Sequence, residues 1–125
     1  MPGDVVEDFG RSIVENVRDR TIASCRTRLQ ADSQHARSRK WRKLAEAGDS
    51  DALLQAVIPD VVDETLFYLL DAIDHGRLRL AAYDQDGKTV DLYEAGLSEL
   101  GGWYVGGDWP KRYSKEPYVS PNDEG

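Results

Sequence analysis

Residues 60–93 read DVVDETLFYLLDAIDHGRLRLAAYDQDGKTVDLY, and the apolar pattern changes its period once within this stretch. In the first half, apolar side chains recur every three or four residues, which is typical of one helix face. In the second half they alternate with other residues on both sides of Asp86-Gly87. Asp-Gly between two alternating runs favours a β-hairpin. The stretch therefore predicts a helix over 60–75 and a hairpin of 77–83 with 88–93.

Further helices are expected on both sides of this stretch. Val6, Phe9, Ile13 and Val17 are spaced by three or four residues and predict an amphipathic helix. Pro59 is expected to break a helix, because proline lacks the N–H that continues the hydrogen-bond ladder. The helices predicted outside 60–93 are 4–29, 33–47, 50–57 and 97–105. The chain after Gly106-Gly107 is expected to be mostly irregular.

These elements predict an α+β fold, a mostly helical single domain with one β-hairpin on which the helices pack. A length of 125 residues is enough to bury one core. Within the single domain 1–125, the basic helical segment is 1–48. The acidic helix, the hairpin and an aromatic-rich region occupy 49–119, and residues 120–125 are expected to be frayed.

Charge is distributed unevenly along the chain. Residues 1–43 hold ten Arg/Lys and six Asp/Glu, a net of +4, whereas residues 44–125 hold six and seventeen, a net of −11. The two sums give the net charge of −7. This asymmetry indicates electrostatic matching to a partner, or between the two parts of the chain.

The predicted helix 60–75 carries five carboxylates and no Lys or Arg. They are Asp60, Asp63, Glu64, Asp71 and Asp74. Three interpretations of these carboxylates are open. They form a face exposed to solvent, a docking surface for a basic partner, or a face covered by the basic segment of the same chain. Paired carboxylates can also perform acid–base work or hold a hard cation.

Aromatic side chains gather among glycines and prolines near the C-terminus, where Trp103 and Trp109 are the largest. Trp and Tyr offer a large contact area at low entropic cost, so they serve either as core or as anchors for a partner. The candidate partner-binding residues are therefore Asp60, Asp63, Glu64, Asp71, Asp74, Trp103 and Trp109.

The segment 37–43 holds five cations around Trp41 and is the alternative binding site. Basic residues beside an aromatic can bind nucleic acid through phosphate charge and base stacking. A pI of about 4.8 for the whole chain disfavours nucleic acid as the partner. A solvated helix face, with Trp41 turned to the core, is the competing interpretation.

The sequence lacks the residue patterns that metal and cofactor sites require, so neither a cofactor nor a metal site is predicted. His35 and His75 have no companion ligands at metal-like spacing. A calcium loop around Asp86-Gly87 would put residues that cannot serve as ligands at its first and twelfth places. The single cysteine, Cys25, is expected to be a small buried apolar residue. The acidic start and the absence of a long apolar run predict a cytoplasmic protein without a membrane partner.

Residues 63–109 read DETLFYLLDAIDHGRLRLAAYDQDGKTVDLYEAGLSELGGWYVGGDW and resemble small acidic uncharacterised bacterial proteins. In size and acidity the chain is similar to immunity proteins, which neutralise a cognate toxin by binding it. The resemblance implies a non-enzymatic inhibitor with a basic protein partner. Free hairpin edges also permit a homodimer. The alternatives are a nucleic-acid-binding or regulatory protein using 37–43, and a small acid–base hydrolase with two of the carboxylates in one pocket.

Overall fold

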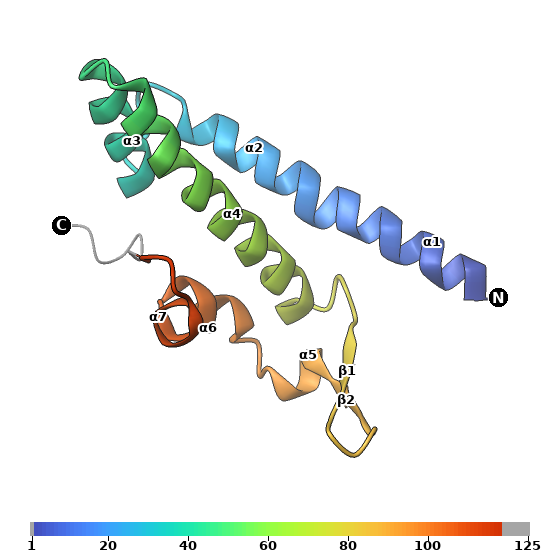
Figure 1. The fold of residues 1–125 in the computed structure, drawn as a ribbon. Helices are drawn as coiled ribbons and strands as arrows, with labels where there is room; N and C mark the ends of the chain where they lie inside the picture. Colours follow the sequence, from blue (N-terminus) through green and yellow to red (C-terminus); the bar gives the residue numbers. More distant parts are fainter. Residues whose placement is uncertain (1, 119–125) are drawn as a thin grey trace.

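Two long helices run side by side and carry the rest of the chain (Figure 1). The computed structural model describes residues 2–118. The predicted frayed tail, residues 120–125, lies outside the described residues.

The first long helix confirms the amphipathic pattern of the N-terminal segment. It consists of α1 (Pro2–Ile13), the π-helical turn η1 (Val14–Arg18) and α2 (Asp19–Arg28). The residues that join these parts keep right-handed helical dihedrals, so the helix continues through the wider turn. Val17 of η1 is buried, and η1 and α2 both pack against the second long helix. α1 projects beyond the end of that helix (Figure 1).

A helix, a tight reversal and a second helix follow. α3 (Ala36–Glu46) begins after His35, whose ring Nδ1 accepts the backbone N–H of Arg37 at 3.1 Å. Gly48 has a φ of 76°, which favours glycine, and it reverses the chain. Asp49 then caps the next helix by accepting the N–H of Ala52 at 3.0 Å.

The predicted break at Pro59 is wrong, because one helix of 25 residues, α4 (Ser50–Asp74), spans both predicted helices. An interior proline weakens a helix by about 3 kcal/mol, through a lost hydrogen bond and ring crowding. α4 packs against α2, η1, α3 and a C-terminal helix. Burying a large apolar side chain contributes about 1.5–3 kcal/mol, so these contacts offset the weak point. Pro59 itself is exposed.

The hairpin is present but shorter than predicted. β1 (Ala81–Tyr83) and β2 (Thr89–Asp91) pair antiparallel, with Ala82 opposite Val90. In the turn, the Asp84 carboxylate accepts the backbone N–H groups of Asp86 and Lys88, both at 2.9 Å. The second strand ends early because Asp91 caps a short helix, α5 (Leu92–Ala95).

The expectation that the helices pack on the hairpin is wrong. All three residues of β1 are exposed, and the hairpin extends beyond the end of α4 (Figure 1). The buried core instead lies where η1, the last turns of α4 and a C-terminal helix meet. Its buried apolar members are Val17, Ala72, Ile73, Leu78 and Leu100.

The C-terminal region contains two short helices, where one was predicted. α6 (Leu100–Val105) starts three residues later than expected, because Leu97 and Ser98 have positive φ values of 54° and 61°. α7 (Asp108–Tyr113) replaces part of the chain expected to be irregular. Pro110 is tolerated there because the first turn of a helix needs few N–H donors.

The fold class predicted from the sequence is confirmed: residues 2–118 are mostly helical and contain one antiparallel hairpin. Among the helices of residues 2–118, none has the length and the apolar content needed to cross a membrane.

Candidate functional site

Asp60, the first predicted contact residue, joins α4 to α3 in the interior. Its carboxylate is 7% exposed and accepts the indole N–H of Trp41 at 2.7 Å. Lys40 Nζ lies 2.8 Å from the same oxygen, and Arg37 Nε lies 3.6 Å from the other one. Trp41 is buried, as the core interpretation of this residue expected. Asp60 therefore neutralises the start of the basic segment.

Glu64, one turn later, joins α4 to α2. Its carboxylate is 3% exposed and accepts Ser24 Oγ at 2.6 Å and Arg28 Nη2 at 2.8 Å. Cys25 Sγ lies 3.5 Å from the second oxygen. Burial and the adjacent Glu64 raise the pKa of the Cys25 thiol to about 11. Cys25 is therefore a poor nucleophile near neutral pH, because the reactive species is the thiolate.

Asp71 and Asp74 also have partners within the chain. Asp71 lies 3.0 Å from Arg20 and 3.8 Å from Arg77. The two oxygens of Asp74 accept the N–H groups of Leu100 and Gly101, at 3.0 and 2.9 Å. Asp74 thus caps α6 from the last residue of α4, which supports a helix whose glycines make it weak on its own.

Asp63 is the one of the five that borders an open groove. It accepts the hydroxyl of Tyr104 at 2.7 Å. Burial, followed by the hydrogen bond to Asp63, raises the pKa of Tyr104. The phenol therefore stays protonated and donates to the carboxylate.

The five predicted contact carboxylates are thus engaged inside the chain, and Asp60, Glu64 and Asp74 are buried. The basic segment 37–43 contacts Asp60 alone of the five, whereas Glu64 and Asp71 pair with Arg28 and Arg20 of α2. Oxygens of all five side chains already accept internal donors, so a partner would have to displace those donors to bind the same oxygens, and the role of these side chains as partner contacts stays a prediction.

The basic segment 37–43 is largely committed to the fold as well. Besides the contacts to Asp60, Arg42 donates to the backbone carbonyls of Gln30 at 3.2 Å and Ser33 at 2.7 Å. These bonds close the loop between α2 and α3. The exposed cations of the segment are Arg39 and Lys43. A nucleic-acid site within 37–43 would depend on these two exposed cations. Binding through phosphate charge strengthens with the number of Lys and Arg contacts, so two cations would bind weakly.

An apolar groove of about 880 Å³ lies between α4 and the C-terminal region. One wall is α4, and the other is formed by α7 and the residues that follow it, with Tyr104 of α6 between them. The groove is lined by Gln55, Ile58, Pro59, Val62, Asp63, Tyr104, Trp109, Pro110, Tyr113, Ser114, Glu116, Pro117 and Tyr118.

The α4 wall belongs to a row of exposed apolar side chains. Ile58 is 60% and Val62 is 52% exposed, and Leu54 and Leu66 continue the row one turn away on either side. Residues four apart share a helix face, so the row runs along α4 for about 18 Å, at 1.5 Å per residue. An exposed apolar surface of this kind marks an interaction site.

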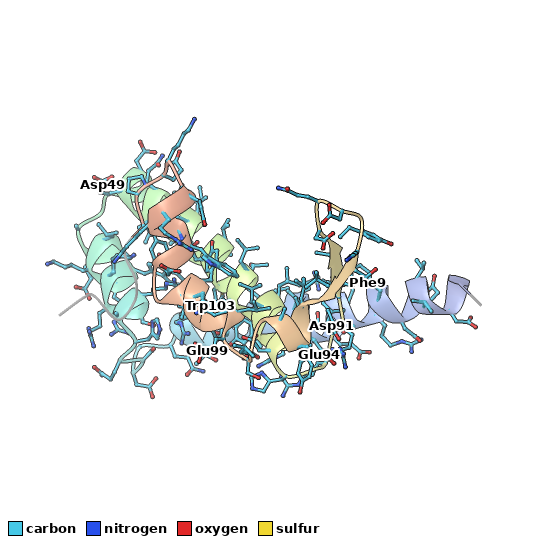
Figure 2. All side chains as sticks on the ribbon, turned by 90° about the horizontal axis from the view of Figure 1, so that it is seen from below. Phe9, Asp49, Asp91, Glu94, Glu99 and Trp103 are labelled. Atoms are coloured by element: carbon cyan, nitrogen blue, oxygen red, sulfur yellow. The ribbon has the colours of Figure 1, made fainter. Side chains whose placement is uncertain are left out.

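The two tryptophans predicted as anchors have different roles. Trp103 packs against the core and does not line the groove (labelled in Figure 2). Trp109 lines the groove while its ring centroid lies 5.7 Å from that of Trp103. Tyr113, beyond Trp109 on α7, is 73% exposed. The aromatic wall is therefore anchored in the core on one side and open to solvent on the other.

Sequence reasoning did not single out Leu54, Ile58, Val62 and Leu66 as an exposed row, and these side chains are exposed. A signal was present in the sequence. Between residues 53 and 66, apolar side chains occupy more than one helix face, and a helix that packs on one side cannot bury all of them. An excess of apolar positions on a surface helix therefore predicts an uncovered face.

The groove offers contact area rather than reactive groups. The hydrolase alternative requires two of the five carboxylates in one pocket, and this groove contains Asp63 alone of the five. Among the described residues, no group of three or more His, Cys, Asp or Glu side chains is arranged to hold a metal ion.

Comparison with known proteins finds no match: no protein-family model, no curated protein and no solved structure matches this chain. The resemblance to immunity proteins therefore stays a prediction.

Proposed function

We propose that this chain is a non-enzymatic cytoplasmic protein-binding protein whose groove receives an amphipathic helix from a protein partner. The observation that carries the proposal is the pair Ile58 and Val62, exposed in the groove that Trp109 and Tyr113 also line. The exposed Leu54 and Leu66 extend this row along α4 on either side of the pair. Helix-in-groove recognition places apolar anchors of the partner, spaced by three or four residues, in such a groove. Trp109 and Tyr113 are of the residue types that contribute most to binding energy.

Polar groups at the groove would fix the orientation of the bound partner helix. Pro59 has no N–H to give to the carbonyl of Gln55, and both residues line the groove. A donor on the partner can therefore bind that carbonyl. The carboxylate of Glu116 is exposed on the opposite wall and favours a basic side chain nearby.

A basic partner also fits the charge of the whole chain. Internal ion pairs leave the net charge of −7 unchanged, and this charge steers cationic partners from a distance. Three exposed acidic residues lie at the turn between α3 and α4, next to the half of α4 that lines the groove: Glu46, Asp49 and Asp51. Within this class we favour an immunity-type inhibitor of a basic toxin. Its contact surface is the groove, which includes Asp63 but not the other four carboxylates.

Site-specific photo-crosslinking tests the proposal. A benzophenone amino acid at Ile58 should crosslink in cells to one protein, through an apolar helical segment of that protein. The same probe at Leu29, an apolar residue that is 70% exposed at the end of α2, is the matched control. Purified partner should then bind the wild type at least tenfold more tightly than Ile58→Asp, and equally well to Leu29→Asp.

The proposal fails if crosslinks at Ile58 are no more specific than those at Leu29, or if Ile58→Asp binds the purified partner as well as the wild type. For a toxin partner, co-expression of the wild-type chain should restore growth. Ile58→Asp should remove that protection while the protein remains folded by circular dichroism.

A further inference from the structure

The groove between α4 and the C-terminal region carries negative charge without positive charge. Of the described residues that line it, two are carboxylates, Asp63 and Glu116, and none is Lys, Arg or His. Most of the remaining lining residues are apolar or aromatic. The groove therefore favours an occupant that is largely apolar and carries a positive charge at one point.

Asp63 differs from the buried carboxylates of α4, because part of its hydrogen-bonding capacity is unused. One oxygen, Oδ1, accepts the Tyr104 hydroxyl at 2.7 Å. Within residues 2–118, no donor contacts the other oxygen and no cation pairs with this side chain. Asp60 and Glu64, in contrast, each pair with a cation of the chain. A half-buried carboxylate without a counter-charge favours a cation from outside the chain.

Tyr104, the donor to this carboxylate, belongs to an aromatic group in the groove. Its ring centroid lies 6.3 Å from that of Tyr118, at an interplanar angle of 75°, and Trp109 lines the same groove. Among the described residues, no Lys or Arg lies over the ring of Tyr104 or Trp109. The ring of Tyr113 differs, because Arg112 lies 4.9 Å from its centroid. A carboxylate and aromatic faces in one apolar groove are the combination that binds an organic ammonium ion.

We infer that Asp63, Tyr104 and Trp109 form an ammonium site, and that the helix bound in the groove fills this site with a lysine side chain. The inference rests on the proposed function, because the lysine belongs to the same partner helix. The stem of lysine is four methylenes long and packs on apolar surface. Pro59 and Val62 supply such a surface on the α4 wall.

Lysine fits the ammonium site better than arginine. A guanidinium presents a planar fork of N–H donors, which is matched best by two carboxylate oxygens. In Asp63 one oxygen is already bonded to Tyr104, so one acceptor remains. A compact ammonium needs no paired acceptors, and it meets the remaining oxygen and an aromatic face together.

Titration with n-butylammonium chloride, which reproduces the end of a lysine side chain, tests the site without a known partner. The NMR signals of the Trp109 indole N–H and the Tyr104 ring should shift saturably, with a Kd on the order of 1–10 mM, because so small a ligand makes few contacts. The indole N–H of the buried Trp41 is the internal control and should not shift. Sodium chloride keeps the ionic strength constant. The neutral n-butanol should bind at least about tenfold more weakly.

Asp63→Asn is the test variant, because asparagine still accepts the Tyr104 hydroxyl but carries no charge. It should weaken n-butylammonium binding at least about tenfold, the loss typical of one charge-assisted hydrogen bond. It should weaken binding of the partner crosslinked at Ile58 by a similar factor. Asp86→Asn removes the same charge from the exposed hairpin turn, outside the groove, and should bind both ligands as the wild type does. Thermal unfolding confirms that both variants are folded.

The ammonium site is refuted if n-butylammonium gives no saturable shift in the wild type, or if Asp63→Asn binds it equally tightly. Tighter binding of n-butylguanidinium overturns the choice of lysine, as does a crosslinked partner whose affinity Asp63→Asn leaves unchanged. The proposed function can fail separately. Ammonium binding without a specific protein crosslinked at Ile58 refutes the protein partner and leaves the ammonium site. A protein that crosslinks at Ile58, without ammonium binding, refutes the ammonium site alone.

Discussion

Trp41 of α3 donates its indole N–H to the carboxylate of Asp60 on α4 across 2.7 Å, and both side chains are buried. Lys40 and Arg37 approach the same carboxylate. One acidic residue therefore holds an aromatic ring and two cations of the basic segment, and this contact decides how α3 lies on α4.

Asp60→Ala should destabilise the protein by about 3–5 kcal/mol, as expected when one partner of a buried ion pair is removed. The reason is that the Trp41 N–H loses its acceptor and the Arg37 guanidinium loses its counter-charge, while both side chains remain buried. Urea unfolding measures the change. Asp51→Ala, at an exposed position on the same helix, is the control and should change the stability by less than about 0.5 kcal/mol. Equal effects of the two substitutions would contradict the role of Asp60.

Asp74→Ala should loosen α6, because the N–H groups of Leu100 and Gly101 lose their acceptor. The expected loss of stability is about 1–2 kcal/mol, typical of a helix cap. Hydrogen exchange at these two amides should accelerate more than exchange in α2. Asp74→Asn retains a side-chain oxygen and should lose less. Unchanged exchange at Leu100 would show that α6 forms without this cap.

Pro59→Ala should stabilise the protein by about 1–3 kcal/mol, because alanine restores an N–H donor for the Gln55 carbonyl and removes ring crowding. Pro59 is exposed, so the change creates no cavity in the core. Thermal unfolding measures the gain. The same variant should bind a groove partner more weakly, since the carbonyl then has an internal donor. A less stable variant would mean that Pro59 contributes packing that outweighs the missing hydrogen bond.

The Cys25 thiol should make stability depend on alkaline pH. Burial and Glu64 raise its pKa from 9.0 to about 11, so the folded chain holds the proton more tightly than the unfolded chain. This contribution is complete below about pH 9 and is lost as the pH rises toward 11. The free energy of unfolding of the wild type should therefore fall more steeply over this range than that of Cys25→Ala. Parallel curves would contradict the raised pKa.

His35 should have the opposite pH dependence. Burial, followed by the charges of Arg28 and Arg37, lowers the pKa of His35, which accepts a hydrogen bond at the start of α3 only when its Nδ1 is unprotonated. The contribution is complete above the ordinary pKa of 6.5 and is lost as the pH falls through the lower value of the folded state. An NMR titration of the ring should give a midpoint below 6.5.

His35→Asn provides the matched comparison, because asparagine caps a helix without titrating. The stability of this variant should lack the decline that the wild type shows below about pH 6.5. If both proteins lose stability equally on acidification, the cap does not depend on the protonation of His35.

Local signals in the sequence predicted most of the elements. The four-residue spacing from Phe9 to Val17 acts within one helix, and the Asp86-Gly87 turn acts within one hairpin. Both elements are present. The prediction failed at Pro59, where tertiary packing outweighs a local break. It also failed after Leu97, where positive φ values at residues other than glycine follow from the surrounding fold.

The candidate site was harder to predict, because its residues are defined by contacts between distant parts of the chain. Glu64 meets Ser24 forty positions away, and Asp63 meets Tyr104 forty-one positions away. Charge counts left open whether the carboxylates face solvent, a partner or the chain's own cations, and they did not show which cations lie close enough to pair. Trp109, a predicted contact residue, lines the groove, while its neighbours Ile58 and Val62 on α4 were not among the predicted contact residues.

The sequence alone determined the periodicity, the caps and the charge imbalance, because these depend on side chains that are neighbours along the chain. Only the tertiary structure decided that Asp60, Glu64 and Asp71 pair with cations of the N-terminal part, and that one face of α4 stays uncovered. The physical reason is that a helix has more apolar and charged positions than its neighbours can cover. Which of them become buried depends on where the other helices pack.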